Sequence, residues 1–198
     1  MYNYTMATKE EREKFIKDRL ALEEGMAEDM NIEIRDYVYH YLIEKKGYSP
    51  EDLHREIKYF IEFCNKNETV SMDIIINIGG RSIVSIKCSP ASLESRERHI
   101  VSFSRIVEPY QIPLSIVTNG DAARMLDTIT GGLIAERLSD MPSKEELEER
   151  LSRMEFKEYP KERLEREKKI LFAFEGIKCC IIDTKKSSGS IYIGEGCG

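Results

Sequence analysis

Apolar residues follow helical spacing through the N-terminal part of the chain. Residues 8–30 are rich in charge and keep one narrow apolar face, formed by Phe15, Ile16, Leu20 and Leu22. This pattern predicts a solvated amphipathic helix. Residues 32–46 predict a second helix, which ends at Gly47 and has an apolar face of Ile34, Val38, Tyr41 and Leu42.

The middle of the chain changes to short runs of β-branched and aromatic residues. Ser49 before Pro50-Glu51-Asp52 combines an N-cap, a helix-first proline and early acids, which predicts a short helix. The apolar runs that follow predict strands at residues 55–63, 70–78, 82–88, 113–119 and, as one or two strands, 122–134. Gly79-Gly80 favours a tight hairpin turn, and residues 92–107 predict a helix.

From residue 139 the chain becomes strongly charged again. Ser143 followed by Glu146 is a capping-box pattern, and residues 143–154 and 160–177 predict two more helices. This order of elements is typical of an α/β protein with a sheet covered by helices. We expect four segments, which are a helical extension (1–30), an α/β core (31–138), a helical appendage (139–180) and a loose Gly/Ser-rich tail (181–198).

Composition narrows the function only slightly. The 198 residues carry a formal net charge of −6, which is not the overall signature of a nucleic-acid-binding protein, although a local basic patch remains compatible with it. No apolar run reaches the roughly 18 residues that span a bilayer, and the N-terminus lacks the apolar core of a signal peptide. We therefore expect a cytoplasmic protein without a membrane partner.

The cysteines and histidines do not predict a metal site. An odd number of cysteines without a secretory signal argues against a disulfide framework; they are Cys64, Cys88, Cys179, Cys180 and Cys197. Their spacing differs from the paired pattern of zinc and iron–sulfur sites. His40, His54 and His99 lie in three separate segments.

Several segments together carry a family resemblance. They are "RDYVYHYLIEKKGYSPEDLHREI", the hairpin "MDIIINIGGRSIVSIKCSP", the helix "HIVSFSRIV" and "PLSIVTNGDAARMLDTITGGLI". In this order they resemble the N-terminal nuclease domain of type I restriction-enzyme R subunits, within the PD-(D/E)xK nuclease superfamily, from about Asn31 to Glu136. The resemblance implies a restriction-endonuclease-like α/β fold with a mixed central sheet flanked by helices, here with extra helices at both ends.

The resemblance also implies where chemistry takes place. In active relatives, the first hairpin strand supplies an Asp and the second a Glu-x-Lys. The carboxylates hold Mg²⁺, which prefers oxygen ligands and prepares the attacking water. Here Asp73 falls on the family Asp, whereas Lys87 replaces the Glu and Ser89 replaces the Lys. Glu33 is a candidate for the helix acid, and Glu56 is a further candidate acid.

Strand alternation places Lys87 and Ser89 on one face, which the family hairpin would share with Asp73. An ammonium group at this position repels Mg²⁺ and pairs with the carboxylate, so the motif predicts an internal salt bridge instead of a metal. The helix that carries Gln-x-x-x-Tyr in the family reads His99-x-x-x-Phe103 here.

Three interpretations stay open at this stage. The first is a degenerate nuclease domain that needs no cofactor and keeps a DNA-binding role. The second is an active Mg²⁺-dependent nuclease in which Lys87 is the catalytic lysine and Asp73 binds metal together with Glu33, Glu56 or Glu94. The third is a non-catalytic scaffold that forms homo-oligomers, suggested by the acidic charge and the extra helices. No ATP-binding phosphate loop occurs in the sequence, so we expect a stand-alone relative of the nuclease domain.

Overall fold

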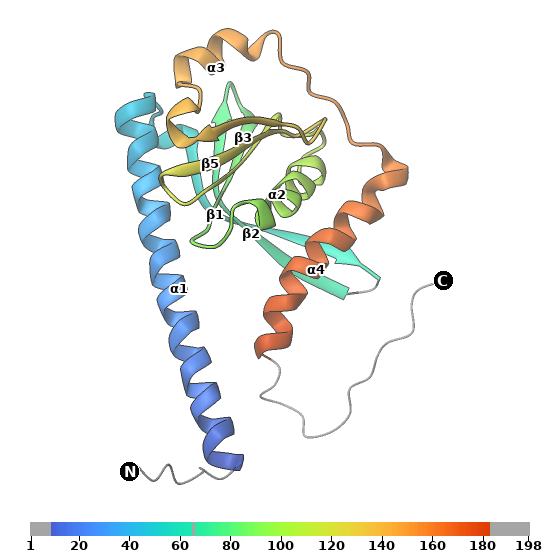
Figure 1. Ribbon diagram of the computed structural model, residues 1–198. Coiled ribbons are helices and arrows are strands. Elements are labelled where there is room, and N and C mark those ends of the chain that lie inside the picture. The colour runs from blue at the N-terminus through green and yellow to red at the C-terminus, as the bar shows by residue number, and fades with distance from the viewer. Residues whose placement is uncertain (1–8, 65, 183–198) are drawn as a thin grey trace.

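The computed structural model describes residues 9–64 and 66–182 (Figure 1). Its elements are, in chain order, α1 (Lys9–Lys46), η1 (Pro50–Asp52), β1 (Leu53–Phe63), β2 (Lys66–Ile78), β3 (Arg81–Cys88), α2 (Glu94–Ile106), β4 (Leu114–Thr118), β5 (Ala122–Asp127), β6 (Leu133–Arg137), η2 (Leu138–Asp140), α3 (Lys144–Leu151), η3 (Lys161–Arg163) and α4 (Leu164–Ile182). The expected tail from residue 183 onward, with Cys197, lies outside the described residues.

The strands form one six-stranded mixed sheet in the order β1-β2-β3-β4-β5-β6. Only β3 and β4 are parallel, and α2 is the crossover that connects them. Every other neighbouring pair is antiparallel. The expected α/β class, with a mixed central sheet flanked by helices, is confirmed.

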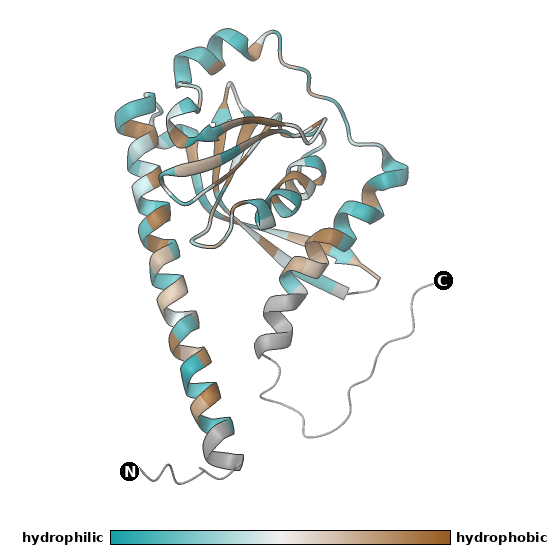
Figure 2. Cartoon of the chain, in the orientation of Figure 1, coloured by the Kyte–Doolittle hydropathy of each residue, from teal (hydrophilic) through white to brown (hydrophobic). Residues whose placement is uncertain are grey.

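Helices cover both faces of this sheet and create two apolar clusters. On one face, Val38 and Leu42 of α1 and Leu147 of α3 pack against the strands. On the other face, Phe103 of α2 and Leu171 of α4 do the same. Figure 2 shows the corresponding apolar colouring along the strands and in bands on the helices. The charged segment after residue 139 thus contributes to both clusters.

Helix α1 differs from the sequence-based expectation because the two expected helices form one continuous helix. The region between them contains no proline, so nothing removes a backbone hydrogen bond there. The helix ends where expected: Gly47 has a φ of +75°, and the Tyr48 N–H donates to the Leu42 carbonyl at 3.2 Å. This is a Schellman-type end. The predicted capping box of Ser143 and Glu146 at the start of α3 is confirmed.

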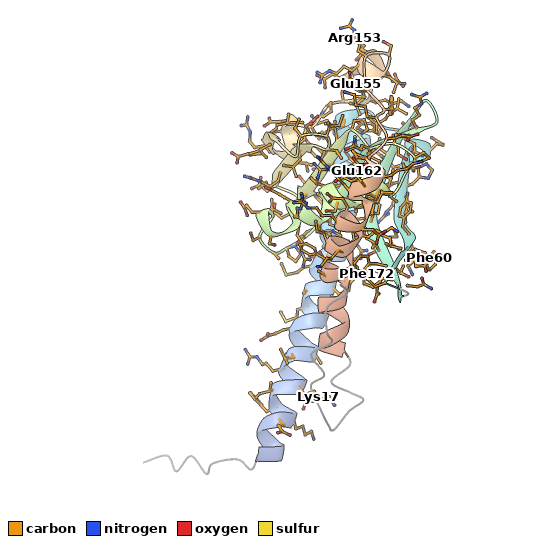
Figure 3. The ribbon with its side chains drawn as sticks, turned by 90° about the vertical axis from the view of Figure 1, so that its right-hand side faces the viewer. Lys17, Phe60, Arg153, Glu155, Glu162 and Phe172 are labelled. Atoms are coloured by element: carbon orange, nitrogen blue, oxygen red, sulfur yellow. The ribbon has the colours of Figure 1, made fainter. Side chains whose placement is uncertain are left out.

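The β1–β2 hairpin extends beyond the rest of the sheet as a two-stranded ribbon (Figure 1). β2 pairs with β3 only from Ile74 to Ile78, whereas its residues 66–72 pair with β1 alone. α4 lies against this ribbon, with the rings of Phe63 and Phe172 centred 5.5 Å apart. Figure 3 shows Phe172 on the helix and Phe60 on the ribbon. A two-stranded ribbon alone is marginally stable, so α4 stabilises it.

A buried carboxylate also connects α4 to α2. Glu167 accepts hydrogen bonds from the Ser102 hydroxyl at 2.6 Å and the Tyr159 hydroxyl at 2.7 Å. The guanidinium groups of Arg105 and Arg98 lie 3.4 and 3.5 Å from the same carboxylate. Burial raises the pKa of Glu167, but these hydrogen bonds and charges outweigh burial and hold the pKa below its usual value.

Membrane insertion by a helix is not indicated for the described part of the chain, where every helix is too short or too polar to cross a bilayer.

Candidate functional site

A polar cavity of about 160 Å³ opens where α1 and α2 approach the β2–β3 hairpin. Its walls come from three regions: α1, the strands β2 and β3 with the residue that follows β3, and the first turn of α2. The lining residues are Glu28, Asn31, Arg35, Ser71, Asp73, Lys87, Cys88, Ser89 and Arg96. The cavity therefore contains three of the six residues that the sequence singled out, Asp73, Lys87 and Ser89.

Strand register places Lys87 directly across from Asp73. The tight turn pairs Ile78 with Arg81, but a bulge at the step between Ile76 and Asn77 leaves Ile83 as an extra residue in β3, so that Ile74 pairs with Ile86. Without this bulge, Asp73 would oppose Ile86, and Lys87 would point to the other face. The bulge is therefore the local feature that joins the two charges.

Asp73 is a buried carboxylate, with only 6% of its surface exposed. One oxygen, Oδ2, accepts the Cys88 backbone N–H at 2.7 Å. The other, Oδ1, lies 3.3 Å from the Lys87 ammonium, which also donates to the Ser71 carbonyl at 3.3 Å. The ion pair predicted from the degenerate motif is thus present in the structure.

Helix α1 adds a second cation to this carboxylate. Glu28, Asn31 and Arg35 occur three and four residues apart, which brings them to one face of the helix. The Arg35 guanidinium lies 3.8 Å from Asp73 Oδ1 and 3.1 Å from Glu28. The buried side-chain oxygen of Asn31 has no hydrogen-bond partner among the described residues. The α1 wall thus supplies one cation and one unsatisfied acceptor.

Glu33 does not reach this cavity. It lies two residues beyond Asn31, about 200° around the helix, and lines a separate surface depression with Tyr37 and Gly120. Glu94 instead accepts a hydrogen bond from the Ser92 hydroxyl at 2.8 Å. The structure therefore brings neither acid to Asp73.

Glu56 lies beside the site but does not line the cavity. The β1–β2 register would place it across from Asp73, yet no pairing joins these two residues. Its backbone is left-handed, with a φ of +52°, an uncommon conformation for a residue with a side chain. Its carboxylate is exposed and lies 3.5 Å from Arg35. Glu56 therefore contacts the site through Arg35.

Two further groups lining the cavity are poor candidates for chemistry. Ser89 is buried, and its hydroxyl accepts the Ala91 N–H at 3.2 Å, so no base activates it. Burial raises the pKa of the Cys88 thiol, and the Asp73 carboxylate raises it further. A neutral thiol is a weak nucleophile.

The residues at this site do not fit Mg²⁺. A hard cation needs several oxygen ligands, but the Lys87 and Arg35 cations both lie within 4 Å of the Asp73 carboxylate. Within residues 9–64 and 66–182, no three His, Cys, Asp or Glu side chains gather in a way that could hold a metal ion.

Sequence reasoning missed Arg35 and Asn31 at the site. The signal that could have found them is helical periodicity, since Glu28, Asn31 and Arg35 follow a single stripe. Arg96 is one of two arginines at the start of α2, with Arg98, and the sequence did not indicate which of them faces the hairpin.

Comparison with known proteins identifies one matching family. The family described as type I restriction enzyme R protein N terminus matches residues 31–142, which span β1–β6 and the C-terminal turns of α1. No curated protein and no solved structure matched the chain. The matched region covers more than half of the sequence and contains Asp73, Lys87 and the hairpin bulge. The chain belongs to the family of type I restriction enzyme R protein N-terminal domains.

Proposed function

We propose that the protein is a catalytically degenerate, nuclease-like domain in which an internal ion pair replaces the metal, and that its cavity binds a phosphate of the DNA backbone. The observation that carries this proposal is the Lys87 ammonium 3.3 Å from Asp73 Oδ1. A lysine at this distance neutralises the carboxylate and repels a divalent cation. Metal-assisted hydrolysis requires the opposite arrangement.

The charges around the cavity support the DNA-binding part of the proposal. Arg35, Lys87 and Arg96 all line it. Arg96 has no ion pair with a carboxylate of the described residues, and its guanidinium lies 5.9 Å from the centre of the Phe174 ring. Arginine side chains with free donors are suited to phosphate oxygens. Arg96 is therefore the residue we expect to contact the DNA backbone.

A cleavage assay tests the catalytic part. Wild type and Asp73→Ala are incubated with plasmid and single-stranded DNA in Mg²⁺ or Mn²⁺. We expect both proteins to leave the DNA intact. Metal-dependent cleavage by wild type that is lost in Asp73→Ala would overturn the proposal and support a nuclease that uses Lys87 as its catalytic lysine.

A restoration experiment tests whether the hairpin is a former metal site. Lys87→Glu combined with Ser89→Lys rebuilds the family pattern next to Asp73. We expect Mg²⁺ to raise the melting temperature of this double variant, because a ligand that binds only the folded state stabilises it, and to leave wild type unchanged. A double variant whose melting temperature does not rise with Mg²⁺ would contradict the assignment of Lys87 and Ser89 to the positions of the family motif.

A DNA-binding titration across salt concentrations tests the binding part. Each lost phosphate contact lowers the salt slope by about 1, and we expect this change for Arg96→Gln. Arg98→Gln is the matched control, because Arg98 lies on the same helix but faces Glu167. Absence of binding even at low salt would favour the scaffold interpretation instead.

A further inference from the structure

The N-terminal two thirds of α1 present apolar side chains to solvent. Only the C-terminal turns of the helix, with Val38 and Leu42, are packed into the core. The rest projects away from the sheet, as Figures 2 and 3 show, with Lys17 labelled on the projecting part. The exposed apolar residues of this part are Phe15, Ile16, Leu20, Leu22, Met26 and Met30, with exposed fractions of 49–65%.

These side chains form two neighbouring lines on one side of the helix, called the apolar stripe below, with the exposed Arg19–Glu23 ion pair between the lines. Ile16, Leu20 and Met30 continue the line of Ile34 and Val38 along the helix at spacings of three and four residues or their multiples, and Phe15, Leu22 and Met26 lie beside them. Glu28 and Arg35, which line the cavity, lie to one side of this stripe. A partner could therefore cover the apolar stripe without filling the cavity.

A helix in this situation needs a partner. Most of the stability of helices in proteins comes from packing an apolar face, and an isolated segment is marginal in water. A contiguous exposed apolar patch marks an interaction surface. The stripe therefore indicates association with another helix, and the charges along the same segment indicate which one.

Charge along the projecting part of α1 is polarised. Among charged residues, 13–19 carry Lys14, Lys17 and Arg19 against Glu13 and Asp18, whereas residues 21–33 carry only acids. A parallel pair of such helices would place acids against acids. An antiparallel pair places the basic end of each helix beside the acidic part of the other, which is favourable.

We infer that the protein self-associates through α1. Two copies pack antiparallel about a two-fold axis that crosses between the helices at the level of Ala21 along each helix. Residues 13–30 of each helix overlap over about 27 Å, and the apolar stripes face each other. An interface of two single helices belongs to the small size class, so the dimer is reversible and depends on concentration. This inference is independent of whether the cavity cleaves or binds DNA.

Sedimentation of the full chain over a concentration series tests the interface. We expect a monomer–dimer equilibrium for wild type and at least an approximately tenfold weaker dimer for Leu20→Glu, since each tenfold change reflects about 1.4 kcal/mol. Ala21→Glu is the matched control: it adds the same charge one residue away, about 100° around the helix and outside the stripe. Leu and Ala are both exposed here, so neither change disturbs the core.

A wild type that stays monomeric at every concentration would overturn the inference, as would equal weakening by Leu20→Glu and Ala21→Glu. Far-UV circular dichroism and melting temperature confirm that both variants fold.

Charge reversal tests the orientation. Glu23→Lys with Asp29→Lys removes acids from the acidic part of α1. We expect this variant to self-associate more weakly than wild type, because its added lysines would face the basic end of the partner helix. A mixture with the complementary variant Lys17→Glu with Arg19→Glu should restore dimers. Stronger self-association of the first variant alone would indicate a parallel arrangement and overturn the antiparallel one.

Discussion

Asp73 on β2 and Glu167 on α4 are both buried carboxylates with positive partners, but their surroundings differ. Glu167 receives two short hydroxyl hydrogen bonds, at 2.6 and 2.7 Å, and two arginines near 3.5 Å. Asp73 receives one short backbone hydrogen bond at 2.7 Å, and its cations lie at 3.3 and 3.8 Å beside a cavity.

This difference distinguishes a buried charge that stabilises the fold from a buried charge at a candidate functional site. The Ser102 and Tyr159 side chains donate short hydrogen bonds to Glu167, so the interactions of this carboxylate stabilise the packing of α4. The cationic partners of Asp73, Lys87 and Arg35, are long side chains that line an accessible cavity. Buried charge alone does not indicate function, whereas buried charge beside an accessible cavity is a better indicator.

Removing the Glu167 carboxylate should have the largest effect on stability. Glu167→Ala leaves Arg105, Ser102 and Tyr159 without their acceptor inside the α2–α4 interface. Breaking a buried charged network in this way costs about 3–5 kcal/mol. The measurement is chemical denaturation of wild type and variant. A loss below about 1 kcal/mol would show that α4 does not depend on this carboxylate.

Removing the Asp73 carboxylate should cost less. Asp73→Ala leaves the buried Cys88 N–H without its acceptor, which costs about 1–3 kcal/mol, but Lys87 and Arg35 can turn toward water in the cavity. The same denaturation experiment gives the value. A loss as large as that of Glu167→Ala would remove the distinction between the two sites.

Acid should weaken the Glu167 network. The folded-state pKa of Glu167 is held below its usual value of about 4.5, so its stabilisation is fully present above that pH and is lost as the pH falls through the folded-state pKa. We expect Glu167→Gln to flatten the dependence of unfolding free energy on pH below about 4.5. An unchanged profile would mean that another carboxylate controls acid sensitivity.

The smallest effect is expected at the exposed rim of the same network. Arg98 is 43% exposed, whereas Arg105 is 11% exposed. Exposed ion pairs contribute about 0–1 kcal/mol, so Arg98→Gln should change the unfolding free energy by no more than this. A larger loss than for Arg105→Gln would contradict the role assigned to burial.

Local patterns in the sequence predicted most of the elements, because apolar spacing, caps and turns act over a few residues. Ser143 with Glu146, Gly47 and the hairpin glycines were readable in this way. The continuous α1 was not, since an exposed helix and a packed helix follow each other without a break. The contact of Asp73 with Lys87 depends on the bulge between Ile76 and Asn77, which no local signal reveals. Only the resemblance to a known hairpin anticipated it.

Glu33 shows that the direction of a side chain on a helix could not be predicted from the sequence. A carboxylate near the start of the expected second helix looked suitable for the site, but its direction depends on the rotation of the helix, which packing of Val38 and Leu42 determines. The same rotation brings Arg35 to Asp73. Propensity and spacing identify a helix, whereas long-range contacts choose the face that meets the hairpin.

The two-stranded ribbon of β1 and β2 has a consequence for the way in which the protein opens. Beyond the left-handed Glu56, residues 57–63 and 66–72 pair only with each other and depend on α4 for cover. Amide hydrogens in this ribbon should therefore exchange with solvent as one cooperative unit together with α4, ahead of those in β3 and β4. Local unfolding would then start at the end of the sheet farthest from β6.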